Sequence, residues 1–475
     1  MQVASFIFCA FVLITLLITS LISPKYRYLG FLAASLLFYA LQDARYLIVL
    51  GVLIVVTYVT GLLAQRYKKA AFISGILINV LVLGYFKYIG FFSGGKITSV
   101  FAPVGLSFYV FMAISYLADI YKGKIAAEKN FFKVALFLSF FPTVTSGPIE
   151  RAGHLLPQFD EENMAKIRFD IDRIRDGFVR MLWGFVMKLV LADRISIMVG
   201  TVYDSPSKYS GSILALASIL YTFQIYFDFA GYTHIVVGAG KVFGLEITEN
   251  FNTPYLSRSI AEFWRRWHMS LSSWLKDYLY IPLGGNRKGT VRKYINVMIV
   301  FMVSGLWHGA GINFIIWGGL HGLYQVIGAV LKPVREKTGR LLHLREGGSA
   351  GEAIISTLFT FCLVNFAWIF FRVTEFKDII AVMKGLMHPQ LINLMDGTVY
   401  TLGVEAPAVV LTFIGILGVI VVDILNYRGI RISEKIAGER LWIRWPVYIA
   451  AIMLIAVCGV WGQGYDSTSF IYANF

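Results

Sequence analysis

Two histidines in apolar surroundings are the residues of this sequence best suited to chemistry. His308 lies in the stretch 301–322, "FMVSGLWHGAGINFIIWGGLHG", and its nearest neighbours, 305–311, are small residues and one large ring. Glycines leave room for a ligand or for a second backbone. An imidazole, with an ordinary pKa of about 6.5, can take a proton from a hydroxyl at neutral pH. The alternative for His308 is a core histidine that bonds a backbone carbonyl.

The second histidine, His268, lies in the stretch 257–283, "SRSIAEFWRRWHMSLSSWLKDYLYIPL". Apolar side chains recur along this stretch at i, i+3, i+4 and i+7, which predicts one amphipathic helix over 259–281. Ser259 and Glu262 predict a capping box at its start. A helix rich in tryptophan with basic flanks is typical of the membrane interface, or lines a cavity at that depth. The alternative for His268 is a side chain that snorkels to the interface.

Two further polar residues interrupt apolar runs. His321 follows His308 by 13 residues, which places the two on different faces of an ideal helix. We therefore expect His321 to form a packing hydrogen bond, and we expect no metal site. Asp228, in "YFDFAGYTHIVVG", is an intramembrane carboxylate. We expect it to pair with an arginine or a histidine rather than to act on a substrate directly.

The region around His268 is strongly basic. Eight Lys or Arg and two Asp or Glu lie between Tyr255 and Lys293, a net charge of +6. Arg287 and Lys288 follow the glycine pair of "PLGG". One interpretation is anchoring on the cytosolic side of a membrane. The other is recruitment of a phosphate-bearing donor such as coenzyme A or a phosphopantetheine carrier.

The composition indicates the kind of scaffold that must position these residues. Of the 475 residues, 57% are hydrophobic and 15% are charged, whereas soluble domains carry about 25% charged residues. The sequence therefore predicts an all-α, polytopic membrane protein with a single domain over 1–475. The net charge of +15 lies mostly in short loops, which favours membrane topology over nucleic-acid binding.

Apolar runs that are candidates for membrane spans recur along the whole chain. We expect about 11 true spans, because two of the runs, 27–41 and 131–148, are short enough to be half-spans or re-entrant segments. If the basic loops face the cytosol, the N-terminus faces outward. The candidate runs are 3–22, 27–41, 46–64, 70–90, 101–120, 131–148, 177–201, 211–240, 294–310, 312–331, 353–371, 405–425 and 444–461.

Several stretches, in this order along the chain, resemble the membrane-bound O-acyltransferase family. The resemblance is greatest to its bacterial branch, which includes the membrane subunits of alginate and peptidoglycan O-acetyltransferases. They are spread over residues 141–475, which is most of the chain. They read "FPTVTSGPIER" (141–151), "KLVLADR" (188–194), "YFDFAGYTHIVVG" (226–238), "ENFNTPY" (249–255), "EFWRRWHMSLSSWLKDYLYIPLGGNRKG" (262–289), "GLWHGAGINFIIWGGLHG" (305–322) and "FIYANF" (470–475).

The resemblance implies roles for the two histidines. It makes His308 the catalytic residue and His268 the second residue of the active site. It also implies a core of tilted helices around a central tunnel, with a funnel on each side and His308 near the constriction. With the observations above, the candidate substrate-binding residues are Trp307, Trp267, Arg265, Arg266, Asp228, Arg287 and Lys288.

The same resemblance implies a reaction and its partners. The donor is expected to be cytosolic acetyl-coenzyme A or an acyl carrier thioester, with no bound cofactor. The acceptor is a polysaccharide hydroxyl outside the bacterial cytoplasmic membrane, reached through a separate extracytoplasmic acyltransferase. Three alternatives remain open: a D-alanyl-transferring relative that serves teichoic acids, an enzyme that acylates lipids or proteins with long chains, and a glycan transporter. The absence of an internal repeat disfavours the transporter.

Overall fold

The computed structural model describes residues 2–93, 102–167, 169–341 and 349–460. In these ranges the regular secondary structure is helical, without a β-strand, which confirms the all-α prediction. The α-helices are α1 (Phe6–Leu21), α2 (Arg27–Ala40), α3 (Tyr46–Leu63), α4 (Lys68–Phe92), α5 (Leu106–Tyr121), α6 (Phe131–Ser139), α7 (Ala152–Leu155), α8 (Glu161–Lys166), α9 (Ile171–Phe185), α10 (Asp193–Tyr203), α11 (Gly211–Phe243), α12 (Ile260–Arg266), α13 (Met269–Leu275), α14 (Thr290–His308), α15 (Ile312–Leu341), α16 (Ala350–Arg372), α17 (Phe376–Leu386), α18 (Ala406–Tyr427), α19 (Ile432–Gly438) and α20 (Leu441–Cys458).

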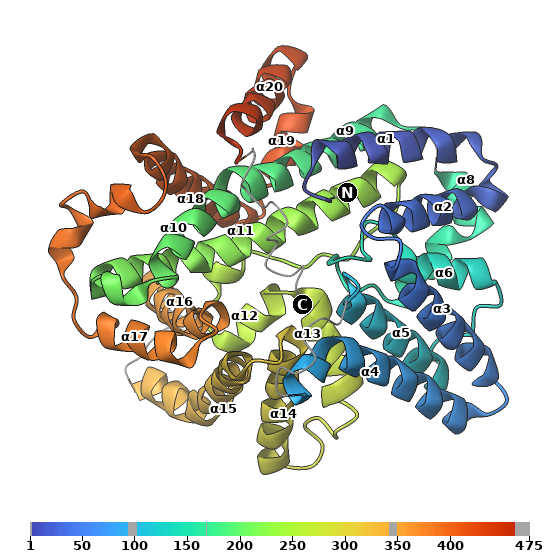
Figure 1. Cartoon of the computed structure of the whole chain (residues 1–475), viewed down its shortest axis with the longest axis horizontal. Helices are drawn as coiled ribbons and strands as arrows, with labels where there is room; N and C mark the ends of the chain where they lie inside the picture. Colours follow the sequence, from blue (N-terminus) through green and yellow to red (C-terminus); the bar gives the residue numbers. More distant parts are fainter. Residues whose placement is uncertain (1, 94–101, 168, 342–348, 461–475) are drawn as a thin grey trace.

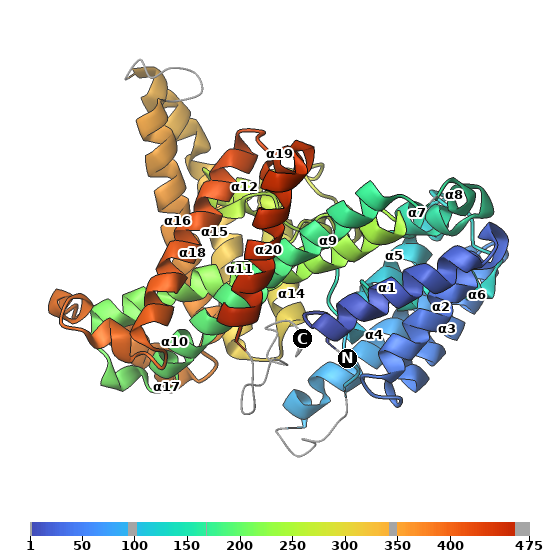
Figure 2. The same ribbon diagram turned by 90° about the horizontal axis from the view of Figure 1, so that it is seen from above.

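Helix α11, with 33 residues, runs across the middle of the molecule (Figure 1). Beside it, α9 continues through the π-helical segment η3 (Val186–Ala192) into α10 without a break. The start of α11 packs near α16 and α17, and its end lies near α1. Helices α2–α6 form one side of the molecule and α15–α17 the other, as the view from above also shows (Figure 2). Helices α18 and α20 pack against η3 from outside.

Glycines allow α9 and α11 to approach within backbone contact. A Cβ atom added at Gly184 would lie 2.5 Å from the carbonyl oxygen of Gly231, and one at Gly238 would lie 2.6 Å from that of Gly177. The two pairs are seven residues apart on each helix, so they repeat on the same helix face after two turns. Small residues at such positions are typical of closely packed helices in membranes.

The surface of the molecule is apolar and its interior holds charges. Ile7, Ile355 and Leu417 are 69%, 69% and 62% exposed, whereas Lys188 and Asp228 are 3% and 2% exposed. Such a surface is costly in water and suited to lipid. The chain is a multi-pass membrane protein.

Within the residues that the structure describes, seven helices are long and apolar enough to cross a membrane, fewer than the predicted 11. They are α3, α4, α11, α15, α16, α18 and α20. Helices α1 and α5 are apolar but shorter. The run 27–41 contains only the 14-residue helix α2, which extends about 21 Å at 1.5 Å per residue. The run 131–148 contains the nine-residue α6 followed by buried turns, so its helix is also shorter than a membrane span requires.

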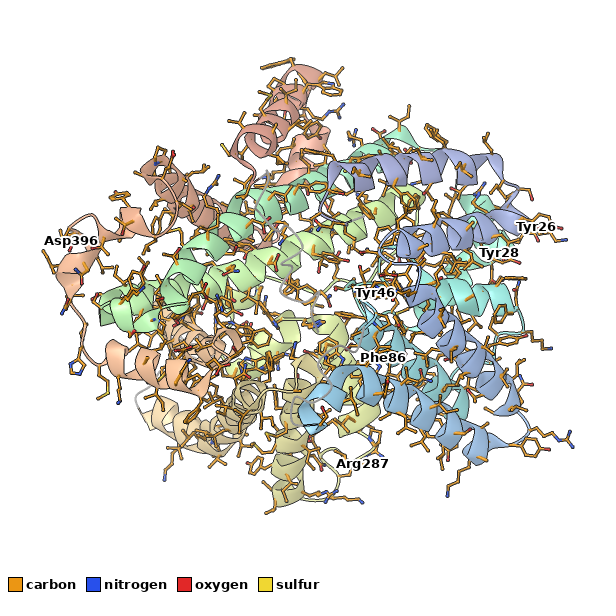
Figure 3. All side chains as sticks on the ribbon, in the orientation of Figure 1. Tyr26, Tyr28, Tyr46, Phe86, Arg287 and Asp396 are labelled. Carbon is orange, nitrogen blue, oxygen red and sulfur yellow. The ribbon has the colours of Figure 1, made fainter. Side chains whose placement is uncertain are left out.

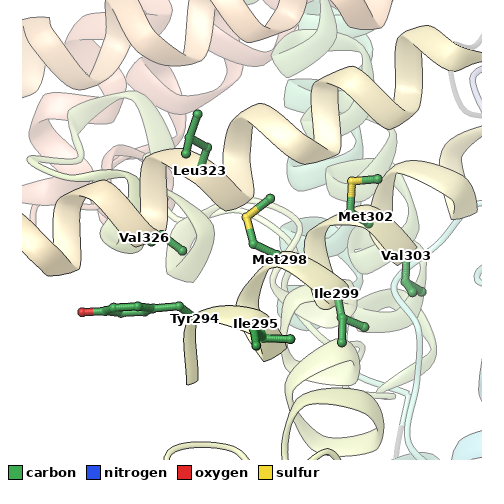
Figure 4. Close-up of a pocket in the computed structure, with 8 residues that line it drawn as sticks. All are labelled: Tyr294, Ile295, Met298, Ile299, Met302, Val303, Leu323 and Val326. Carbon is green, nitrogen blue, oxygen red and sulfur yellow. The ribbon is translucent and has the colours of Figure 1, made fainter. Parts of the chain in front are cut away.

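Helices α14 and α15 form a tight antiparallel hairpin. An added Cβ atom at Gly305 would lie 2.3 Å from the carbonyl oxygen of Phe314, and one at Gly318 would lie 2.3 Å from that of Phe301. His308 is the last residue of α14 and lies beside the turn of this hairpin. Farther from the turn, the two helices form an open apolar groove of about 550 Å³ (Figure 4). Its lining residues are Tyr294, Ile295, Met298, Ile299, Met302, Val303, Leu323 and Val326.

Candidate active site

The tertiary structure brings His268 and His308 together, although 40 residues separate them in sequence. Both rings contact the indole of Trp307, with ring centroids 6.0 Å from His268 and 4.9 Å from His308. The two histidines are 0% and 2% exposed. They lie where the α12–α13 segment meets the end of α14, and Figure 1 shows α12 and α13 near the middle of the molecule. The predicted pair therefore shares one enclosed site.

The prediction of one continuous helix over 259–281 is wrong at His268. Helix α12 ends at Arg266, and His268 has a left-handed backbone with φ of 43° before α13 begins at Met269. This conformation costs a residue with a side chain about 1–2 kcal/mol. Periodicity missed the break because Leu271, after it, is also buried. One face of the segment, with Phe263, Trp267 and Leu271, is buried in the protein, and the π-helical segment η6 (Lys276–Tyr280) continues α13.

Asn250 holds the backbone at this break. Its Oδ1 atom lies 3.3 Å from His268 Nδ1 and accepts a hydrogen bond of 3.2 Å from the Ser270 N–H. Its carbonyl oxygen accepts a hydrogen bond of 2.9 Å from the Met269 N–H. Asn250 was not predicted as a site residue, although the stretch "ENFNTPY" that contains it is part of the family resemblance. These contacts orient the ring of His268 as well as its backbone.

The predicted capping box is present in part. The Ser259 hydroxyl accepts a hydrogen bond of 3.2 Å from the Glu262 N–H, as expected. The Glu262 carboxylate accepts from the N–H of Arg258, one residue before the cap, at 2.9 Å. The cap fixes the residue at which α12 starts, and it therefore helps to position His268, which follows the end of this helix.

Aromatic rings enclose His308. Its imidazole meets Trp317 and Phe371 edge to face, with centroids 5.0 and 5.1 Å away. Trp307, on its other side, contacts Phe108 and Phe111 of α5. Apolar rings exclude water and favour an uncharged imidazole, the form that accepts a proton.

Two residues of α4 fasten the end of α14 beside His308. The Lys87 ammonium donates to the carbonyl oxygen of Trp307 and, at 3.2 Å, to the hydroxyl of Ser107. The Tyr88 hydroxyl donates to the carbonyl of Leu306 at 2.5 Å. Both carbonyls belong to the last turn of α14, where a helix lacks internal donors and favours a cation. Sequence reasoning missed Lys87, although a lysine inside an apolar run is itself a signal.

His321 has the packing role that the sequence predicted. Its Nδ1 atom accepts a hydrogen bond of 3.2 Å from the Trp264 indole N–H. Its ring also contacts Trp317, which in turn contacts His308. His321 therefore supports the wall of the site.

Asp228 pairs with a lysine, so the prediction of an arginine or histidine partner is wrong. The Lys188 ammonium lies 2.6 Å from Asp228 and 2.7 Å from Asp193, and all three side chains are at most 3% exposed. The sequence around Asp228 could not identify its partner, because Lys188 lies in η3 and Asp228 in α11, and these segments meet only in the folded chain. The next residue, Phe229, contacts the His268 ring at 4.7 Å, so the ion cluster also positions the wall of the site.

The other predicted binding residues fall into two groups. Trp267 is buried among aromatic side chains, and Arg266 pairs with Glu262 at 3.0 Å and bonds Thr253 at 3.1 Å. Both are thus engaged in packing within the protein. The three exposed residues are Arg265, Arg287 and Lys288. Figure 3 shows Arg287 at the rim of the molecule, in the turn that precedes α14, where an incoming anion can reach it.

The arrangement suits proton transfer in a dry site. Two imidazoles share one aromatic enclosure, and a lysine fastens the helix end that carries one of them. The groove of Figure 4 is lined by α14 and α15 residues away from the pair, so the tunnel with two funnels stays a prediction. The C-terminal stretch 470–475, "FIYANF", lies outside the described residues.

Comparisons with known proteins find relatives of this chain. The model of the membrane-bound O-acyltransferase family matches residues 125–362. The chain is 36% identical to the probable alginate O-acetylase of Pseudomonas aeruginosa over 370 residues, which are 73% of this chain and 67% of that protein. It is 34% identical to the peptidoglycan O-acetyltransferase of Helicobacter pylori over 403 residues, 77% and 74% of the two chains. Identity to the teichoic acid D-alanyltransferase of Bacillus subtilis is 28% over 284 residues, 56% and 71%.

Proposed function

Because the chain belongs to the membrane-bound O-acyltransferase family, we propose that it moves an acetyl group from a cytosolic thioester toward a polysaccharide outside the membrane. The observation that carries this proposal is the meeting of His268 and His308 at Trp307 inside a membrane-embedded core. The relatives named for alginate and peptidoglycan acetylation match about three quarters of the chain. The relative named for D-alanyl transfer matches only 56% of it. These matches favour acetyl over D-alanyl transfer.

His308 acts as the general base in this proposal. It takes the proton of the acceptor hydroxyl while the oxygen attacks the thioester carbonyl. A C–O bond forms, the C–S bond breaks, and the thiolate leaves with a proton. His268 lies across Trp307 and stabilises the oxyanion or orients the carbonyl. Exclusion of water by the surrounding rings protects the thioester from hydrolysis.

The donor enters from the cytosol in this proposal. Acetyl-coenzyme A and an acyl carrier thioester both carry phosphate on a long, thin pantetheine arm. The exposed Arg287 and Lys288 suit the phosphate, and a narrow passage admits the arm but not a polymer. The acetyl group then crosses a hydrocarbon layer of about 30 Å through the protein. A separate extracytoplasmic acyltransferase completes the transfer, and we place the chain in the bacterial cytoplasmic membrane.

Single alanine variants test the proposal directly. His308→Ala should abolish acetyl transfer from the thioester while the protein remains inserted. His268→Ala should reduce transfer about 100-fold, the effect usual for a lost oxyanion donor. His321→Ala, the matched control in the same wall, should reduce stability more than turnover. Near wild-type transfer by His308→Ala would refute the assignment of the base.

Donor specificity separates the remaining alternatives. Purified protein in vesicles is supplied with acetyl, D-alanyl and palmitoyl thioesters, and the release of free thiol is measured. We expect acetyl thioester to be consumed fastest. Preference for the palmitoyl donor would indicate an enzyme for lipids or proteins, and no thiol release from any donor would indicate a transporter.

A further inference from the structure

A buried carboxylate lies outside the histidine pair, in a stretch that the proposed mechanism does not use. Glu150, in "FPTVTSGPIER", has a side chain that is 0% exposed. Its oxygens accept hydrogen bonds from the N–H of Thr248 at 2.6 Å and from the Thr248 hydroxyl at 3.0 Å. A third contact, of 2.8 Å, joins it to His154 Nδ1. Burying a carboxylate is costly without such partners.

These contacts lead toward His268 by two routes. Thr248 is two residues before Asn250, the residue that holds the backbone break at His268. On the second route, the N–H of Ile149, next to Glu150, donates to the hydroxyl of Ser270 at 3.0 Å. Segment 149–150 therefore contacts both the loop that carries Asn250 and Ser270, which is two residues after His268.

The backbone of His268 requires such support. A left-handed conformation at a residue with a side chain persists only where the surrounding structure imposes it. The loop 244–250 is not helical, so its position depends on contacts such as those of Glu150. The contact with His154 is itself favourable, because hydrogen bonding to the Glu150 carboxylate raises the pKa of His154.

We propose that Glu150 is a positioning residue for acyl transfer: it holds Asn250 through Thr248 and thereby fixes the His268 ring against Trp307. The inference rests on the proposed role of His268. The inference gives a structural role to two sequence stretches: "FPTVTSGPIER" holds "ENFNTPY" in place, and "ENFNTPY" orients His268.

A double-mutant cycle separates positioning from a general effect on the fold. Glu150→Gln keeps the volume but removes the charge and replaces one acceptor oxygen by a donor. It should reduce kcat about 10-fold or more, because small displacements of a reacting group are costly, and should leave the KM for acetyl-coenzyme A within about twofold. In the His268→Ala background the same change should have no further effect on kcat. Glu246→Gln, an exposed glutamate of the same loop, is the matched control and should leave kcat unchanged.

The outcomes distinguish this inference from the proposed function. Full activity of His268→Ala would overturn the role of His268 and, with it, the basis of the inference. An equal loss on Glu150→Gln in both backgrounds would overturn the inference alone, as would an increase in KM without a loss in kcat.

A second pair of variants serves if Glu150→Gln fails to fold. Thr248→Val removes only the hydroxyl donor to Glu150, and Thr248→Ser retains it. We expect a loss in kcat for valine that depends on His268, and near wild-type kcat for serine. A valine loss that persists in the His268→Ala background would overturn the inference.

Discussion

Replacement of Lys188 by methionine should destabilise the protein strongly. The Lys188 ammonium is the shared partner of Asp193 and Asp228, at 2.7 and 2.6 Å, and its side chain is only 3% exposed. Methionine preserves most of the length and apolar character of the side chain. The variant therefore tests the charge and its hydrogen bonds, and leaves two buried carboxylates beside each other.

The expected loss follows from the burial of the cluster. Removing one partner of a buried ion pair costs about 3–5 kcal/mol, because the remaining charge is left uncompensated. Folded proteins are stable by only about 5–15 kcal/mol, so the loss is a large part of the total. A variant with Lys188→Met, Asp193→Asn and Asp228→Asn carries no charge in the cluster. It should recover more than half of the loss, since it has no charge to desolvate.

Unfolding of purified protein in mixed micelles by added SDS, followed by tryptophan fluorescence, measures these differences. Lys124→Met is the matched control, because the Lys124–Asp119 contact is 3.5 Å long and the lysine side chain is 55% exposed. It should change stability by less than about 1 kcal/mol. A Lys188→Met protein as stable as this control would refute the reasoning, and so would a triple variant no more stable than Lys188→Met.

Two further variants test the packing around the site. Gly184→Ala should lower the thermal unfolding temperature, because its Cβ would lie 2.5 Å from the Gly231 carbonyl oxygen. The control Gly84→Ala, with no atom within 4 Å of the new Cβ, should leave that temperature unchanged. Equal unfolding temperatures for the two variants would contradict the close packing of α9 and α11. Lys87→Met should reduce kcat about 10-fold, because it removes a charged hydrogen bond, worth about 1.5–3 kcal/mol, that holds the end of α14 beside His308. A kcat equal to that of the wild type would show that the end of α14 keeps its position without Lys87.

The two candidate histidines of the site could be identified from local sequence. His308 and His268 each lie in a stretch whose composition already indicates an enclosed imidazole, through glycines in one case and tryptophans in the other. Apolar periodicity and length predicted the helical class, and they marked the run 131–148 as short, which agrees with its nine-residue helix α6. These properties depend on neighbours within a few turns of helix, so they can be read from a linear pattern.

The break at His268 could not be predicted in the same way. The residues on both sides, Trp267 and Leu271, are buried, so the apolar pattern continues through a point where the helix does not. The left-handed backbone is held by Asn250, 18 residues earlier in the chain. A periodic pattern records which side chains are buried, but it does not record the hydrogen bonds that interrupt a helix.

The partners of the charged residues were decided by the tertiary structure alone. Lys87 reaches a carbonyl 220 residues later, and Asp228 finds Lys188 on a separate helix. In a membrane interior each charge must be paired or hydrogen-bonded, so the sequence determines that a partner exists. Which partner it is depends on how closely the helices approach, which glycines such as Gly184 allow. Ion pairs act over only a few ångströms, and the number of residues between two charges does not give their distance in the folded chain.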